Sequence, residues 1–208
     1  MALLSKGILG GISGKVGNVV GGSWKGIDYI RSLASSVANP RSPGQVSQRS
    51  KFTSVVAIGS QLLGSIIQAF WNGKVPKMSG FNAFVKENIE EFTAQGVAIW
   101  QNLLFSKGSL LSPSGIIIGS QNSNGDFVIN WVDNGGVGNA LSTDLVSVVA
   151  YNEGSAEWFT LVFGAARSIE TVSFTIPNFD NNTDTHLYIF ASRLGNNAIQ
   201  TNSNYILA

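Results

Sequence analysis

The sequence predicts an α+β fold with three parts: a glycine-rich N-terminal arm, a helical hairpin, and a C-terminal antiparallel β-sandwich of immunoglobulin or fibronectin type III kind. Three observations predict it. Residues 1–41 combine many glycines with basic side chains, residues 42–96 carry apolar side chains at helical spacing, and from about residue 98 the apolar pattern has a period of two. We therefore divide the chain into an assembly arm (1–41), a two-helix hub (42–96) and a sandwich domain (97–208).

The composition favours burial between subunits. Charged residues are 12% of the chain, about half the usual share of roughly 25%, so a monomer would present an unusually neutral surface. Residues 1–51 hold seven Lys/Arg and one acid, a net charge of +6, while residues 52–208 hold six Lys/Arg and eleven acids, a net charge of −5. We expect the opposite ends of two copies to attract each other.

The chain lacks the residues that several functional classes need. The chain has no cysteine and one histidine, His186, which rules out thiolate and multi-histidine zinc sites. The acidic run from Asp180 to Asp184 has Thr185 where a calcium loop needs glycine, which favours a polar turn. Asp126, Asp133, Asp144, Glu153 and Glu157 are expected to be solvated charges in or beside turns. We predict no enzyme activity, no cofactor and no metal.

The first residues do not have the pattern of a secretory signal peptide. The longest apolar run, 55–71, is interrupted by glycine, serine and glutamine and is shorter than the roughly 20 apolar residues that span a bilayer. We expect a soluble protein made in the cytoplasm, with no membrane span.

The arm carries eight glycines at spacings of mostly three or four: Gly7, Gly10, Gly11, Gly14, Gly17, Gly21, Gly22 and Gly26. We expect a mostly extended arm with a short helical piece, in which glycine permits turns and close backbone contact. The apolar side chains of Trp24, Ile27, Tyr29 and Ile30 need a surface to cover, since burial of each is worth roughly 1.5–3 kcal/mol.

Two helices follow the arm. Ser42, Pro43 and Gln45 form a capping pattern that starts the first helix, which should continue to about Trp71 and be buried on several sides. Ser79 is a suitable cap for the second helix, from about 80 to 94, whose apolar face should dock on the first helix.

The remainder alternates apolar and polar residues between turn residues, which is typical of an antiparallel sandwich. We expect strands near 103–105, 116–119, 126–132, 145–152, 158–163, 171–176, 186–192 and 204–207. His186 should be a packed or surface strand residue on the same face as Tyr188 and Phe190. The other aromatic residues of this part should fill mainly the sandwich core.

A family resemblance rests on the arm. The residues Gly14-Lys-Val-Gly-Asn-Val-Val-Gly21, Trp24-Lys-Gly26, Tyr29-Ile-Arg31 and Asn39-Pro-Arg41 stand out, followed by Gln45, Gln48-Arg49 and Lys51-Phe52. This combination resembles an uncharacterised protein family common in Bacteroidota genomes and their phages, over essentially the whole chain. The family implies no activity, but its Asn-Pro-Arg pattern is similar to one in phage structural proteins.

The arm has features of two nucleotide-related sites but lacks the full pattern of either. The run Gly10-Gly-Ile-Ser-Gly-Lys15 has three residues between its glycines where a phosphate loop has four, and Val16 follows the lysine in place of Ser or Thr. Nucleic acid could contact the basic residues and stack on Trp24 and Tyr29, yet the arm has no Arg-rich run and no known binding motif.

The sequence therefore predicts a non-enzymatic structural protein that self-assembles or docks through its arm, with itself or other virion proteins as partners. The resemblance implies a phage particle, as a capsid decoration, head fibre, connector or tail protein, assembled in the bacterial cytoplasm. The alternatives are a binding module whose sandwich recognises a protein or carbohydrate, and an arm that binds nucleic acid. The predicted interface residues are Gly14, Lys15, Gly17, Asn18, Gly21, Trp24, Lys25, Gly26, Tyr29, Arg31 and Arg41.

Overall fold

The chain forms two units, Met1–Ser42 and Pro43–Ala208. We call them the N-terminal unit and the C-terminal unit and describe each by itself. The structure, a computed structural model, describes residues 3–4, 12–24, 27–36, 39–72, 78–195 and 199–208. The first boundary lies beside the predicted end of the arm at residue 41. The helices and the sandwich, predicted as separate parts on the two sides of residue 96, belong to one unit.

The C-terminal unit contains a sandwich of two antiparallel sheets. One sheet has the strand order β10-β9-β12-β13 and the other has the order β11-β8-β7. The strands are β7 Ser114–Gln121, β8 Asp126–Val132, β9 Leu145–Asn152, β10 Glu157–Ala166, β11 Thr171–Thr175, β12 Thr185–Ser192 and β13 Asn204–Leu207. The predicted antiparallel sandwich is confirmed, and β8, β9 and β13 have the predicted bounds.

Alternate residues of the facing strands fill the space between the two sheets. Strand β8 contributes Phe127, Ile129 and Trp131, each at most 3% exposed. The opposite sheet contributes Val148 of β9 and Ile189 of β12. Burial of such side chains is the main stabilising contribution to a sandwich of this size.

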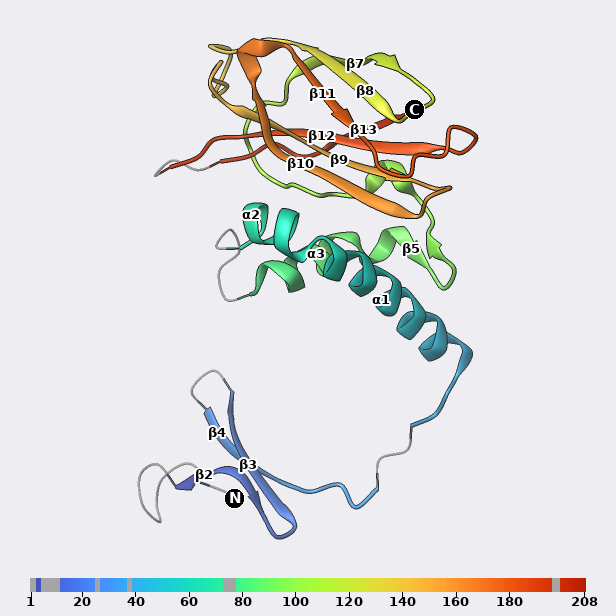
Figure 1. Cartoon of the computed structure of the whole chain (residues 1–208). Helices are drawn as coiled ribbons and strands as arrows, with labels where there is room; N and C mark the ends of the chain where they lie inside the picture. The colour runs from blue at the N-terminus through green and yellow to red at the C-terminus, as the bar shows by residue number, and fades with distance from the viewer. Residues whose placement is uncertain (1–2, 5–11, 25–26, 37–38, 73–77, 196–198) are drawn as a thin grey trace. The chain divides into compact units, whose positions relative to one another are not determined.

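A layer of helices covers the other face of the sheet β10-β9-β12-β13 (Figure 1). It consists of α1 Pro43–Gln61, a π-helical turn Leu63–Ile67, α2 Gln68–Phe70 and α3 Gly80–Asn88. Phe70 contacts the rings of Phe190 in β12 and Phe163 in β10, with centroids 4.8 and 5.4 Å apart. Because both of its faces are covered, β12 is buried along its whole length.

The second layer changes two expectations. Trp131 and Phe174 lie in the core between the sheets, whereas Phe190, Trp158 and Phe163 pack against the helices, so the aromatic residues form two cores. The hub predicted for residues 42–96 is a layer of the same unit as the sandwich.

The first helix differs from its prediction. It bends by 71° between Pro43–Gln61 and Leu63–Phe70, where Ile67 N–H donates to Leu62 C=O across five residues. Its first half is exposed, with Phe52 52% accessible, because only the second half lies against the sheet. At Gly59 a Cβ would come 3.1 Å from the ring of Phe81, so glycine lets α3 approach closely.

The second helix begins as predicted, since the Ser79 hydroxyl accepts a hydrogen bond from Asn82 N–H at 3.2 Å. It ends earlier than predicted, at Asn88, because the 3₁₀ turn Ile89–Glu91 leads into the short hairpin of β5 Phe92–Thr93 and β6 Gly96–Val97. A further 3₁₀ turn, Trp100–Asn102, connects this hairpin to the sandwich. The third 3₁₀ turn, Arg167–Ile169, joins β10 to β11.

The predicted strand at 103–105 is wrong. This segment is buried, but side chains satisfy its backbone in place of a neighbouring strand. Asn88 accepts from Leu104 N–H at 2.7 Å and donates to Leu104 C=O at 3.0 Å, and Trp71 Nε1–H donates to Phe105 C=O at 2.9 Å. The apolar residues of this segment are therefore buried like those of a strand, but their backbone is not paired with a neighbouring strand.

In the described part of the chain, no single helix is long and apolar enough to cross a bilayer. The one stretch that meets the length and composition requirement is α1 together with Leu63–Phe70, on the two sides of the bend.

Candidate functional site

The N-terminal unit is a four-stranded antiparallel sheet in the order β1-β2-β3-β4. Its strands are β1 Leu3–Leu4, β2 Ile12–Val16, β3 Val19–Trp24 and β4 Ile27–Ser32. The arm is thus extended as predicted, and the described residues 12–36 contain no helical piece.

Two predicted interface residues form the turn between β2 and β3. Gly17 has φ +57°, in the left-handed region, as a two-residue hairpin turn with glycine in its first position requires. The carbonyl of Asn18, the second turn residue, accepts from Leu33 N–H at 2.7 Å. Gly17 and Asn18 therefore connect β2 to β3 and hold the end of β4.

Glycine at position 21 lets the strands of the sheet approach closely. Gly14 and Gly21 are directly paired across β2 and β3. A Cβ at Gly21 would lie 2.0 Å from the carbonyl oxygen of Ile12, so no other residue fits without displacing β2. The ring of Tyr29 in β4 covers the neighbouring Gly22, whose cross-strand partner it is.

The strand register places the cationic residues on one face. Lys15 pairs with Val20, and Val20 pairs with Arg31, so these three side chains form a row across the sheet. Tyr29 lies two residues before Arg31 and therefore on the same face. Lys15, Arg31 and Tyr29 are all exposed. The register thus brings together three residues predicted separately from the sequence.

The opposite face of the same sheet is apolar and exposed. Val16, Val19 and Ile30 share this face and are 57%, 40% and 62% accessible. Among the side chains described for residues 12–36, no apolar one is buried; Gly21, which has no side chain, is the one buried residue. The sheet therefore has no core of its own in the described part of the unit.

The other predicted interface residues are placed less fully. Trp24 ends β3 and pairs with Ile27, while Lys25 and Gly26 lie outside the described residues. Arg41 is exposed in the segment that precedes α1, outside the strands. The strand register brings the other predicted interface residues onto one surface. The sequence carried no signal for this register, because the glycines of β2 and β3 interrupt the alternation of apolar and polar residues.

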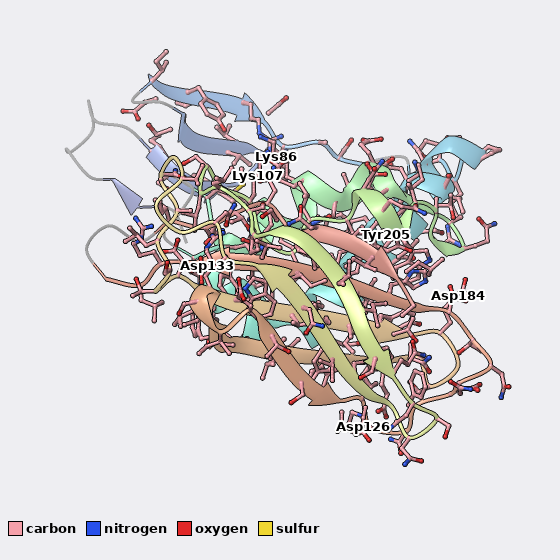
Figure 2. All side chains as sticks on the ribbon, turned by 90° about the horizontal axis from the view of Figure 1, so that it is seen from above. Lys86, Lys107, Asp126, Asp133, Asp184 and Tyr205 are labelled. Carbon is pink, nitrogen blue, oxygen red and sulfur yellow. The ribbon has the colours of Figure 1, made fainter. Side chains whose placement is uncertain are left out.

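The five carboxylates considered in the sequence analysis are distributed over the sandwich. Figure 2 shows Asp126 and Asp133 at opposite ends of β8, with Asp184 apart from both. Hydrogen bonds from Thr175 and Asn122 lower the pKa of Asp126, which is exposed. In the Asp180–Asp184 run, Asp180 Oδ1 accepts from Asn182 N–H at 2.9 Å, which is the polar turn predicted there.

Asp144 contradicts the prediction of a solvated charge, because its side chain is fully buried. It accepts from Arg193 Nε–H at 2.8 Å and from Leu141 N–H at 2.8 Å. Arg167, also fully buried, lies 3.6 Å from the same carboxylate, and its guanidinium donates to Asn134 Oδ1 and to Leu111 C=O. Burial lowers the pKa of Arg167, and the charge of Asp144 opposes this shift. The group is a buried charge network that holds loops together.

His186 is a packed strand residue, as predicted. The residue is 3% exposed, and its ring stacks on that of Trp100 with the ring centroids 4.0 Å apart. Nδ1 lies 2.9 Å from the Tyr205 hydroxyl and Nε2 lies 3.1 Å from Glu153 Oε1. Both ring nitrogens thus have partners. In the described part of the chain there is no group of three or more histidine or acidic residues that could hold a metal ion.

Comparison with known proteins gives a family. Residues 11–207 match the model of a family of unknown function, DUF6266, which covers nearly the whole chain. A search of the curated proteins found no match. Because the match spans the arm, the helices and the sandwich together, the chain belongs to the DUF6266 family.

Proposed function

We propose that the protein is a non-enzymatic structural protein that assembles through the sheet of its N-terminal unit. The observation that carries the proposal is the exposure of apolar side chains on both faces of this sheet. Ile27 is 66% accessible on one face, and Val16 and Ile30 are nearly as accessible on the other. The described residues of the sheet form no apolar core. A sheet of this size needs an apolar face covered by another element to be stable, which a partner would provide.

The partner we propose is the C-terminal unit of a second copy. Residues 1–42 hold five Lys/Arg and one acid, a net charge of +4, which leaves −3 for residues 43–208 since the whole chain is +1. Lys15 and Arg31 share one exposed face of the sheet, so the cations are in position to meet an acidic surface. Copies that exchange N-terminal units in this way would form closed rings or open chains.

The setting we propose is a phage particle, in which the protein would be a capsid decoration, head fibre, connector or tail protein. Its support is the similarity of the Asn39-Pro-Arg41 pattern to one in phage structural proteins. The sandwich is proposed to be of the fibronectin type III kind, because a three-stranded and a four-stranded antiparallel sheet built from seven consecutive strands match that architecture. Such a module is compatible with many functions, so the N-terminal sheet carries the functional argument.

Charge reversal at Arg31 tests the proposal. We expect Arg31→Glu to weaken self-association at least tenfold, because it places a negative charge against the acidic unit of the neighbouring copy. Raising NaCl from about 0.05 to about 0.5 M should weaken the wild-type assembly as well, since exposed charges are screened. Sedimentation velocity over a concentration series measures both effects.

The matched control is Lys86→Glu, which changes the net charge by the same amount at an exposed position of α3 in the C-terminal unit. This variant should associate at least as strongly as the wild type. Equal association of the wild type and Arg31→Glu would contradict the role of the cationic face.

A further inference from the structure

A cavity in the C-terminal unit lies between the helices and the hairpin that joins β9 to β10. Its volume is about 380 Å³, at the lower end of the usual range for small-molecule sites, roughly 300–1,000 Å³. It is lined by Ile58 and Gln61 of α1, by the β5–β6 hairpin, and by Tyr151 and Trp158 of the sheet, with Trp100 between them.

The aromatic wall of the cavity is fixed by packing. Tyr151 and Trp158 are cross-strand partners in β9 and β10, with ring centroids 4.7 Å apart. Trp100 stacks on Tyr151 at 5.0 Å and on His186 at 4.0 Å. These rings contact one another as well as the cavity, so their positions are set before any ligand arrives.

The cavity has hydrogen-bonding groups without partners among the described residues. The indole N–H of Trp158, the indole N–H of Trp100 and the hydroxyl of Tyr151 make no hydrogen bond to any of them, and none of the three atoms is buried. The two indoles in the cores of this unit behave differently, since Trp71 donates to Phe105 C=O and Trp131 donates to Arg167 C=O. The three groups at the cavity are instead accessible and without a protein partner, so they are available to bond a ligand.

The remaining polar lining supplies acceptors and further donors. Gln61 and Gln95 present exposed side-chain amides, each of which both donates and accepts. Glu153 adds a carboxylate, of which one oxygen contacts His186. No lysine or arginine is among the described residues that line the cavity, so an anionic ligand would meet a carboxylate without a neutralising charge.

A second hollow continues the cavity along α1. It has a volume of about 370 Å³ and shares Gln61, Ala156 and Trp158 with the first. It adds the hydroxyls of Ser65 and Thr160, the carboxylate of Glu157 and, again, no described lysine or arginine. The two hollows adjoin at the three residues they share, and we call them together the groove.

We propose that this groove binds a neutral oligosaccharide. A sugar hydroxyl both donates and accepts, which matches indole donors, a carboxylate acceptor and amides that do both. The C–H groups of a pyranose ring suit the apolar parts of the aromatic wall, of Ile58 and of Val97. A cationic group brings only hydrogen-bond donors, which would leave the indole N–H groups of Trp100 and Trp158 without an acceptor.

The test uses the full chain on an array of immobilised neutral, anionic and cationic oligosaccharides, followed by titration calorimetry with the neutral oligosaccharide that binds best. We expect Trp158→Phe, which keeps an aromatic ring but replaces the indole and loses its N–H, and Gln95→Ala each to raise Kd at least fivefold. Gln101→Ala is the matched control, an exposed glutamine of the turn Trp100–Asn102 outside the groove, and should stay within twofold of the wild type. Unchanged thermal transitions verify folding.

Three results would overturn the proposal: no binding of any neutral oligosaccharide, binding that Trp158→Phe and Gln95→Ala leave unchanged, or stronger binding of anionic sugars. The groove would be assigned to a peptide if members of a library of basic peptides displaced the bound sugar at concentrations where the sugar displaces those peptides only weakly. Assembly plays no part in this proposal, because all the residues tested belong to the C-terminal unit.

Discussion

Asp144→Ala is expected to lower the free energy of unfolding of the C-terminal unit by about 3–5 kcal/mol, because it leaves buried cations without their counter-ion. Arg167 is fully buried and Arg193 is largely so, and the carboxylate of Asp144 is the acidic side chain that contacts both guanidinium groups. Loss of the carboxylate also removes the acceptor of Leu141 N–H. Thermal denaturation followed by circular dichroism should show a Tm lowered by roughly 6–20 °C.

Asp126→Ala is the matched control for this prediction. Asp126 is exposed and hydrogen-bonded to Thr175 and Asn122, so its removal should leave the Tm close to that of the wild type. A loss below about 1 kcal/mol for Asp144→Ala would mean that the buried network contributes little to holding the loops together.

Phe70→Ala should cost a similar amount, about 3–5 kcal/mol, because the ring fills the space between the helices and the sheet. Phe70 is 1% exposed and makes an edge-to-face contact with Phe190 at 4.8 Å. Its loss would leave a cavity at the contact that makes the helices and the sandwich one unit. Urea denaturation should show the loss as a lower midpoint with an unchanged slope.

The control is Phe52→Ala, in the same helical layer. Phe52 is 52% exposed on the first half of α1, so its truncation should change the stability by less than about 1 kcal/mol. If Phe70→Ala instead produced two separate transitions, the helices and the sandwich would be independent domains.

The strands of the sandwich were predictable because their cause is local. In β8, a short run rich in β-branched and aromatic residues lies between an Asn-Gly turn at one end and Asp133 at the other, and the structure reproduces the predicted bounds. The cap of α3 at Ser79 was equally local. The covering of both faces of β12 was not, because a continuous apolar run is compatible with a helix or with several kinds of buried strand.

Long-range side-chain contacts explain the remaining errors. The sequence predicted a strand at 103–105, yet the side chains that bond its backbone belong to Asn88, Trp71 and Ser203, all more than ten residues away in the chain. The sequence predicted a solvated charge in a loop at Asp144, because neither Arg167 nor Arg193 is near it in the sequence. Hydrogen bonds of this kind depend on the fold and leave no periodic signal.

In the N-terminal unit, the residue types were predictable and their arrangement was not. Glycines next to basic and aromatic residues indicated an extended arm, and the structure describes strands there. The row of Lys15, Val20 and Arg31 depends on the register, which the turn at Gly17 fixes. One residue of slippage would place Arg31 on the opposite face.

The most direct measurement of the central claim is the mass in solution of the full chain and of residues 43–208, by light scattering over a range of concentrations. We predict that the full chain forms oligomers whose mass increases with concentration, and that residues 43–208 are monomeric while retaining a cooperative thermal transition. If both are monomers at the highest concentration, or if both form the same oligomer, the N-terminal sheet is not what assembles this protein.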